Sequence, residues 1–251
     1  MSLFIVELNS AFRNWLEPEM QSYFMKMVEL KRKGYAKNYP IHYMPVDTTD
    51  FIGSHHLICK EDENGVMVLA GFRTVLLEQC VFYKIPFPAV VITSKAGQGT
   101  EKHLQAVMDL VENAMINRTK MIFSGSWTIN PEVKSDPELV QVAKDVTTAI
   151  LYWHQTENDI KDGLALGVVR AKTDVHFCEQ GYSPIKHEGQ ILSTFEVLDV
   201  DCKEVRLMHK ISFTEKAYLI AVKYRHLWDR KISIGRIYGI DEFDDGMSNA
   251  A

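Results

Sequence analysis

The sequence contains few cysteines, and their positions exclude the common cysteine-based metal and redox motifs. Four occur among 251 residues, at Cys59, Cys80, Cys178 and Cys202, and no two form a Cys-x-x-Cys pair. A chain of this length can bury a complete hydrophobic core without disulfides or a structural metal. We therefore expect reduced thiols and a cytoplasmic location.

Long hydrophobic runs and an excess of positive charge are also missing. No apolar run approaches the roughly 20 residues that a membrane-spanning helix needs, and residues 1–16 lack the basic region and cleavage site of a signal peptide. The formal net charge of −5 gives no general case for a nucleic-acid partner. With 46% hydrophobic and 24% charged residues, the composition indicates a soluble globular protein without integral-membrane contact.

Hydrophobic periodicity predicts alternating helices and strands. The expected helices cover residues 17–33, 104–115, 138–155, 175–178 and 217–227. The expected strands cover residues 54–60, 66–75, 121–129, 164–169 and 190–200. The Asn64-Gly65 pair is a tight-turn signal that joins the first two strands into an antiparallel hairpin. The acidic tail from Asp241 is expected to fray.

Helix-end signals refine these boundaries. Gly34 follows a basic run and is expected to end the first helix. Thr173 or Asp174 is expected to cap the short helix, which Gly181 ends.

The order of elements predicts an α/β (α+β) fold with helices on both faces of a mixed, mostly antiparallel sheet, rather than a regular βαβ series. Nothing in the sequence suggests a linker. We therefore expect a single domain over residues 1–251, with a core over about 20–200 and a C-terminal helical and strand extension over about 203–240.

The loop of residues 130–136 leads into the long helix predicted at 138–155. Ser135-Asp136-Pro137-Glu138 is a capping-box pattern with proline in the first turn. The free N–H groups and positive dipole end of a helix start can bind phosphate or pyrophosphate. Lys134 and Ser135 add one charge and one hydroxyl donor. Because most capped helices bind nothing, the residues alone favour a purely structural role for this loop.

Residues 121–185 resemble the acyl-thioester-binding core of Gcn5-related N-acyltransferases. The shared order is a strand, an Asn130-Pro131-Glu132 loop, a long helix, a second strand and then Phe177-Cys178-Glu179-Gln180-Gly181-Tyr182. In that family a phrase like Phe-Tyr-x-x-x-Gly-Phe follows the second strand, and the first strand and its loop hold the pantetheine and pyrophosphate of an acyl thioester.

The resemblance implies an acyl-CoA or acyl-phosphopantetheine donor. The cofactor-binding positions that it implies lie on the first strand and in the loop: Ser126, Trp127, Ile129, Lys134, Ser135 and Asp136. A hydroxyl on this strand, from Ser124 or Ser126, could hold a pantetheine amide. Serines on a strand are more often ordinary hydrogen-bonded residues.

The upstream half resembles the acyl-homoserine-lactone synthase branch and its relatives that make N-acyl amino acids. Asp47-Thr48-Thr49-Asp50 precedes a hairpin that ends in Gly71-Phe72-Arg73. That branch has an acidic pair spaced by two residues and then a strand ending in Arg-Leu. By resemblance, Asp47, Asp50 and Arg73 are the catalytic candidates.

The chemistry of these three residues suits an acyl transfer to an amine. A carboxylate can orient an ammonium group and help deprotonate it, and an arginine can hold a substrate carboxylate or organise the two aspartates. From the residues alone, turn and capping roles are favoured for Asp47 and Asp50, and the resemblance makes a catalytic role equally favoured. Arg73 is equally well explained as a surface residue of an edge strand.

The sequence also departs from the family. The Arg/Gln-x-x-Gly-x-Gly loop of acetyl-CoA enzymes is absent after Ile129. Homoserine-lactone synthases usually carry a Glu and an Arg in the strand where this chain has Phe123-Ser124-Gly125-Ser126-Trp127. Cys178 stands where a general-acid tyrosine is often found. The resemblance therefore identifies no catalytic base.

A second segment, Ser94-Lys95-Ala96-Gly97-Gln98-Gly99, nearly matches the glycine loop. It follows an apolar run at residues 89–93 that is interpreted as a strand, and it precedes a helix. Glycines there would let the backbone approach phosphates closely. We favour the loop at 130–136, because the earlier segment would leave two strand–helix units before Gly181-Tyr182.

The remaining reactive residues have simpler explanations. His55 and His56 point to opposite faces of a strand and cannot form one dyad. Cys178 lacks a nearby His–Asn pattern, so a small core residue is favoured over a thiol nucleophile. His176 and Cys178 are too few for a metal site, and no metal is expected.

Two basic clusters stand out in this acidic chain. They are Lys31-Arg32-Lys33 with Lys37, and Lys223, Arg225, Arg230 and Lys231 around Trp228. Acyl carrier proteins are acidic, so a basic patch beside a thioester cleft would speed encounter. A solvated helix face is the simpler explanation of either cluster, and an acyl carrier protein is kept as a candidate partner.

We expect an N-acyltransferase that moves an acyl group from acyl-carrier protein or acyl-CoA to the amine of a small amino-acid-like acceptor. Backbone N–H groups at residues 126–129 of a bulged strand would polarise the thioester carbonyl. The alternatives are an acetyl-CoA-dependent acetyltransferase and a non-catalytic ligand- or partner-binding protein on the same scaffold.

Overall fold

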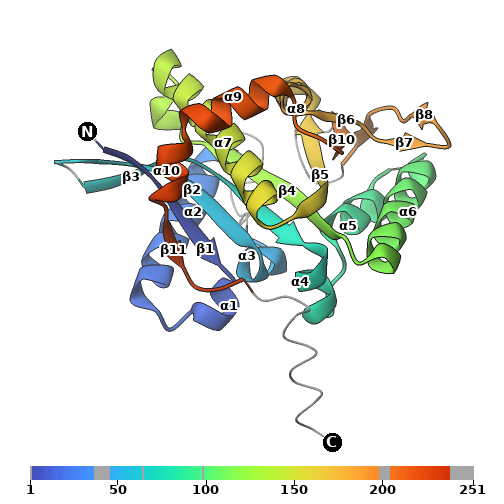
Figure 1. The fold of residues 1–251 in the computed structure, drawn as a ribbon, viewed down its shortest axis with the longest axis horizontal. Coiled ribbons are helices and arrows are strands. Elements are labelled where there is room, and N and C mark those ends of the chain that lie inside the picture. Colours follow the sequence, from blue (N-terminus) through green and yellow to red (C-terminus); the bar gives the residue numbers. More distant parts are fainter. Residues whose placement is uncertain (1, 37–45, 64, 98, 198–203, 238–251) are drawn as a thin grey trace, which may run out of the picture.

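A nine-stranded sheet forms the centre of the computed structural model, which describes residues 2–36, 46–63, 65–97, 99–197 and 204–237. The strand order is β11-β1-β2-β3-β4-β5-β10-β6, with β9 beside β10 (Figure 1). These strands are β1 (Ser2–Asn9), β2 (Ser54–Asp62), β3 (Gly65–Leu76), β4 (Lys120–Ile129), β5 (Ile160–Val168), β6 (Tyr182–Pro184), β9 (Phe195–Glu196), β10 (Glu204–Lys210) and β11 (Ile232–Ile234). A small separate hairpin joins β7 (Lys186–His187) to β8 (Gln190–Ile191).

Neighbouring strands of the large sheet are mostly antiparallel. The β1–β11 and β4–β5 pairs are parallel. The mixed, mostly antiparallel sheet flanked by helices is thus confirmed, and so is the β2–β3 hairpin.

Helices cover both faces of this sheet. They are α1 (Ala11–Asn14), α2 (Pro18–Tyr35), α3 (Thr48–Ile52), α4 (Leu77–Phe82), α5 (Pro88–Lys95), α6 (Glu101–Asn117), α7 (Pro137–Glu157), α8 (Thr173–Gln180), α9 (Glu215–Lys223) and α10 (Arg225–Asp229), with the 3-10 turns η1 (Pro131–Val133) and η2 (Val169–Ala171). None of the described helices is long and apolar enough to cross a membrane.

Successive side chains of a strand point to opposite faces of the sheet, so the helices that each side chain contacts can be placed on one face or the other. Ile5 and Ile58 pack with α7, α9 and α10, whereas their neighbours Val6 and Leu57 pack with α2. Phe123 packs with α5 and α6 on the same side as α2. We call the two sides the α7 face and the α2 face.

Glycine 34 does not end the first helix, contrary to the prediction. Helix α2 continues to Tyr35, and Gly34 lies against β4. A Cβ atom on Gly34 would overlap the Cγ2 methyl of Thr128. The glycine therefore permits close packing of helix on strand rather than a stop.

Residues 89–93 form part of helix α5, so the strand interpretation of this run is wrong. Pro88 occupies the first turn, where its fixed φ favours a helix. The run is too short for periodicity to separate a buried helix from a strand.

Two C-terminal predictions also need correction. Residues 190–200 do not form one strand: the short strands β8 and β9 flank residues that are in neither, and 198–200 lie outside the described residues. The helix predicted at 217–227 is divided at Tyr224 into α9 and α10. The tail from Asp241 lies outside the described residues.

The predicted caps of two helices are displaced. Asp136, not Ser135, is the N-cap of α7, and its carboxylate accepts from the N–H of Leu139 at 3.0 Å. Helix α8 starts after Lys172 without a side-chain cap, because the Thr173 hydroxyl instead accepts from the N–H of Val168. Gly181 does end α8, with a φ of 108° that suits glycine.

Five strands were not predicted individually, namely β1, β6, β7, β10 and β11. Strand β1 is an interior strand between β2 and β11, and its apolar stretch is interrupted by buried Glu7. Strand β10 inserts between β5 and β6, and β11 pairs with β1 from the far end of the chain. These pairings join distant segments, which local patterns do not reveal.

Candidate active site

The site begins where the parallel strands β4 and β5 separate. They pair from Lys120 and Ile160 as far as Ser124 and Ala165. Beyond this point β4 continues against β3, while β5 continues against β10. Among the described residues, the edge of β4 that faces β5 pairs with no strand after Ser124, so its backbone groups are available to a ligand.

A β-bulge lies on β4 at this separation. The register with β3 shifts between Gly71 and Arg73, and Ser126 adopts a φ of 56°, in the left-handed region. Such a backbone is unusual for a residue other than glycine, and bulges re-aim strands beside active sites. The predicted bulged strand therefore has its bulge at Ser126.

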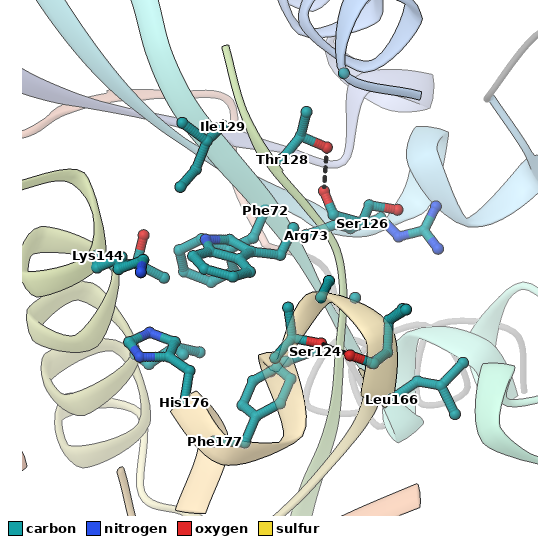
Figure 2. A pocket seen from close by; sticks show the side chains of 18 of the residues that line it. Phe72, Arg73, Ser124, Ser126, Thr128, Ile129, Lys144, Leu166, His176 and Phe177 are labelled. Carbon is teal, nitrogen blue, oxygen red and sulfur yellow. Dashed lines mark hydrogen bonds between the residues drawn. The ribbon is translucent and has the colours of Figure 1, made fainter. Parts of the chain in front are cut away.

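A cavity of about 690 Å³ lies between the two strands, and residues from both faces of the sheet line it. Phe72 and Thr147 line it on the α7 face, and Arg73 and Ile92 line it on the α2 face. In Figure 2, Lys144 and His176 lie on one side of β4 and the guanidinium of Arg73 lies on the other. The cavity therefore has two ends whose lining residues differ in chemistry.

The end on the α7 face is cationic and aromatic. Lys134 and Lys144 line it, and within the described chain neither forms an ion pair. Trp127 stacks on His176 with ring centroids 5.1 Å apart, and its buried indole N–H has no hydrogen-bond partner among the described residues. This end can bind an anion and donate to a carbonyl oxygen.

The end on the α2 face is built on Lys31, Asp47, Asp50 and Arg73, which we call the arginine cluster. Arg73 contacts both oxygens of Asp47, at 2.9 and 3.4 Å, and Asp50 at 2.6 Å. Lys31 from α2 also pairs with Asp50. The structure thus brings all three predicted catalytic residues together.

The two aspartates occupy different environments. Asp47 is the N-cap of α3, its side chain is 63% exposed, and it lines the cavity. Asp50 is 1% exposed, is not among the cavity-lining residues, and accepts from the N–H of Asp47 at 2.8 Å in a capping box. The capping interpretation and the ion-pair interpretation both hold for this pair.

Electrostatics keep the buried part of the cluster charged. Burial alone would raise the pKa of Asp50, but the charges of Arg73 and Lys31 outweigh it and hold that pKa well below its ordinary value. Burial lowers the pKa of Lys31, while Asp50 and Asp47 raise the pKa of Arg73 against the effect of its own burial. Asp50 is therefore a fixed anion rather than a group that exchanges protons near neutral pH.

His55 and His56 lie on opposite faces of β2, as predicted. His55 Nε2 is 2.8 Å from the backbone oxygen of Asp50, and burial lowers the pKa of His55 to about 4. Neither histidine lines the cavity.

Tyr35, at the end of α2, is a cavity residue that the sequence did not single out. Burial raises the pKa of its phenol, and hydrogen bonds with Thr128 and Ser126 oppose that rise. The phenol is held against the bulge, beside the end of the cavity that Arg73 lines.

The predicted donor-binding residues divide into two groups. Ser126, Trp127, Ile129 and Lys134 line the cavity. Ser135 and Asp136 do not, and the Asp136 carboxylate already caps α7. A carboxylate at that helix start would also repel a phosphate.

Three other sequence interpretations can be settled. Gly97 and Gly99 do not line the cavity, and their segment follows a helix, so the glycine-loop alternative is wrong.

Cys178 is exposed, contrary to a core position, and does not line the cavity. Lys31 is 3% exposed and paired, so it belongs to no basic surface patch; Lys37 lies outside the described residues.

The spacing of residues along α7 could have identified Lys144 as a cavity residue from the sequence. Val140, Lys144, Thr147 and Leu151 are spaced by four, three and four residues, so they share one face of α7, and all line the cavity. This half-buried lysine gives the α7 side of the cavity a positive charge.

No protein-family model matches the sequence, and no curated protein sequence matches it significantly. Solved structures match in fold. The CoA-dependent acyl-homoserine lactone synthase BjaI, solved with SAM and isopentyl-CoA, has 10% identity to this chain, covers 92% of each chain and gives a TM-score of 0.50. TofI, solved with an inhibitor and MTA, has 10% identity, covers 88% of this chain and 97% of its own, and gives a TM-score of 0.50. As the sequence resemblance predicted, the chain has the fold of acyl-homoserine lactone synthases such as BjaI.

Proposed function

We propose that this chain is an N-acyltransferase that moves an acyl group from a CoA-type thioester to the amine of a small amino-acid-like acceptor. The observation that carries the proposal is the cavity between β4 and β5, whose lining residues come from both faces of the sheet. In such a cavity, a donor bound from one face and an acceptor bound from the other would bring their reacting groups together.

The donor is assigned to the α7 face. Lys134 and Lys144 would pair with its phosphates, and the free edge of β4 with the Trp127 indole N–H would bind the pantetheine amides. The acyl chain would lie against apolar lining residues such as Phe123, Leu166 and Phe177. The fold shared with BjaI, which was solved with isopentyl-CoA, supports this assignment.

The acceptor is assigned to the end lined by Asp47 and Arg73. Asp47 would attract the ammonium group and help remove its proton, and the buried Arg73 Nε, which has no partner among the described residues, would donate to an acceptor oxygen. Asp50 and Lys31 would act as positioning residues that fix Arg73.

The reaction needs one C–N bond to form and one C–S bond to break. The free amine attacks the thioester carbonyl, backbone N–H groups at residues 126–129 stabilise the oxyanion, and the intermediate collapses to an amide and a thiol. The proton lost by the nitrogen ends on the thiolate or in solvent.

The test incubates the purified chain with acyl-CoAs from acetyl to long-chain and a panel of amino acids and related amines. Amine-dependent release of thiol, with a product mass equal to the N-acyl amine, is expected. The same donors loaded on acyl carrier protein test that partner. Absence of amine-dependent thiol release with every donor of both kinds contradicts the proposal.

Lys144→Ala tests the donor end. Losing one charge-assisted phosphate contact should raise the KM for acyl-CoA by about fivefold to tenfold with little change in kcat. Lys161→Ala is the matched control, because Lys161 is exposed and pairs with Asp159. Equal KM values for the two variants would remove Lys144 from the donor site.

A further inference from the structure

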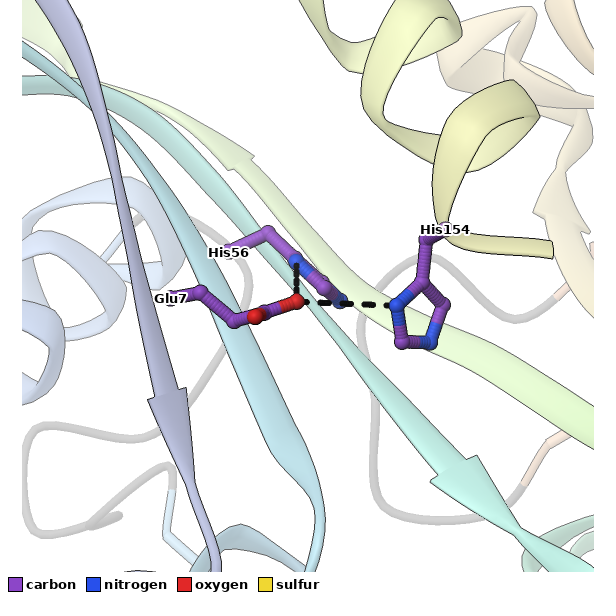
Figure 3. Close-up of side chains that lie close together, drawn as sticks. All are labelled: Glu7, His56 and His154. Carbon is purple, nitrogen blue, oxygen red and sulfur yellow. Dashed lines mark ion pairs between the residues drawn. The ribbon is translucent and has the colours of Figure 1, made fainter. Parts of the chain in front are cut away.

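We propose that Glu7, His56 and His154 form a binding site for a divalent transition-metal ion such as zinc. These residues, which we call the histidine cluster, come from β1, β2 and α7 (Figure 3). They are not among the residues that line the cavity. Two imidazoles and one carboxylate are a donor set that zinc and neighbouring metals prefer.

The three candidate ligand atoms converge on one point. Oε1 of Glu7 is 3.5 Å from Nδ1 of His56 and 3.5 Å from Nδ1 of His154, and all three atoms lie within 4.8 Å of one another. Ligand atoms at about 2.0–2.1 Å from a tetrahedral zinc ion are roughly 3.4 Å apart. A direct hydrogen bond would instead bring nitrogen and oxygen to about 2.7–3.2 Å.

The Nδ1 atoms of the two histidines lack hydrogen bonds within the described part of the folded chain. Both Nδ1 atoms are buried and hydrogen-bond to no other described residue, and the side chains of His56 and His154 are 0% and 2% exposed. The two Nε2 atoms share the Thr74 hydroxyl, at 3.0 and 3.4 Å. If that hydroxyl donates to one ring and accepts from the other, one neutral imidazole must turn an Nδ1 lone pair toward the carboxylate.

A bound cation would remove the repulsion between this Nδ1 lone pair and the carboxylate of Glu7. Both rings can then donate Nε2–H to the two lone pairs of Thr74, and both Nδ1 lone pairs point at the metal. Partners also hold the other oxygen of Glu7, since Oε2 accepts from Ser233 at 3.1 Å and from Asn9 at 3.4 Å. Such contacts orient a ligand set in known metal sites.

The fold explains why the ligands meet. Glu7 and His56 are directly opposite each other in the β1–β2 register, and His154 lies near the end of α7 above them. Ser233, on β11, connects that strand to the cluster through its hydrogen bond to Glu7. A bound ion would join β1, β2 and α7. The ring of His56 also stacks on that of the cavity residue Phe72, with centroids 4.8 Å apart.

The test uses the full-length chain without a histidine tag. After treatment with chelator, the protein is titrated with Zn²⁺ and with Co²⁺, and metal content is measured by mass spectrometry. We expect one equivalent per chain, visible absorption bands of low-symmetry Co²⁺, and a Tm that rises with Zn²⁺. Less than stoichiometric zinc with no change in Tm overturns the proposal, whatever the chain's enzymatic activity.

Variants locate the ion. Glu7→Gln and His154→Gln should each weaken zinc binding at least tenfold and abolish the zinc-dependent rise in Tm, with folding checked by circular dichroism. His103→Gln is the control, since His103 is also buried with an unpartnered Nδ1 but belongs to no such group. Zinc binding that is unchanged in the first two variants, or lost equally in the third, also overturns the assignment.

Discussion

The two faces of strands β2 and β3 each bury a charged cluster, and the consecutive residues His55 and His56 point into different ones. In the arginine cluster, Lys31, Arg73 and the two aspartates pair with one another. In the histidine cluster, one carboxylate faces two imidazole nitrogens that have no hydrogen-bond partner among the described residues.

The difference is one of charge balance. Buried charges are tolerated when they are paired and hydrogen-bonded. The arginine cluster meets this condition from its own side chains, so it can hold Arg73 rigidly at the cavity. In the histidine cluster, two neutral rings that share the Thr74 hydroxyl would turn one Nδ1 lone pair toward the Glu7 carboxylate, and a bound cation would balance both groups.

The largest effect should come from Asp50→Asn. The substitution leaves Lys31 and Arg73 buried with only the exposed Asp47 to balance them, and breaking a buried pair in this way costs about 3–5 kcal/mol of unfolding free energy. Chemical denaturation of the purified variant measures this loss.

Asp47→Asn is the matched control for that experiment. Its side chain is 63% exposed, so the same chemical change should cost less than about 1 kcal/mol. Similar losses for both variants would contradict the division of the cluster into a buried fixed anion and an exposed cavity residue.

Acid should destabilise the arginine cluster through His55. Its folded pKa of about 4 lies below the unfolded value of about 6.5, so the unfolded chain binds more protons between these values. Stability should therefore fall as pH drops from about 6.5 to about 4, by on the order of 3 kcal/mol from this residue. Denaturation at several pH values should show a shallower fall for His55→Gln, and parallel pH profiles would contradict the assignment.

A smaller loss is expected for Gly34→Ala, which tests how α2 presents the arginine cluster to β4. The new Cβ would overlap the Thr128 methyl, and overpacking of this kind costs about 1–3 kcal/mol. Thr128→Ser removes that methyl, so the double variant should recover most of the stability. A double variant as unstable as Gly34→Ala would show that the helix backbone, not the methyl, is the obstacle.

The smallest effect is expected at Ser126, which lies on the bulge of β4 and lines the cavity between the two faces. Glycine adopts a positive φ without steric cost, so Ser126→Gly should stabilise the fold by up to about 1 kcal/mol. If the hydroxyl contributes to the site through Tyr35, acyl transfer should fall while thermal stability rises. A loss of stability would show that the bulge is held by the serine side chain.

Local sequence patterns predicted the elements around the site better than its residues. The hairpin of β2 and β3, strand β4 and the long helix α7 have strong periodic or turn signals, and all are present. The roles of Asp47, Asp50 and Arg73 remain predictions, although the structure brings these residues together. Lys31 was misjudged because a basic run looks solvent-exposed until Asp50, nineteen positions away, is packed beside it.

By itself, the sequence determined the mixed sheet, the resemblance to an acyl-thioester scaffold and the strand that carries Ser126 and Trp127. These depend on local periodicity and on the order of motifs. Only the folded chain shows that β4 and β5 separate, that β1 and β11 extend the sheet beyond β2, and that Glu7, His56 and His154 meet. Such features arise from contacts between segments far apart in the chain, and no spacing within one segment encodes them.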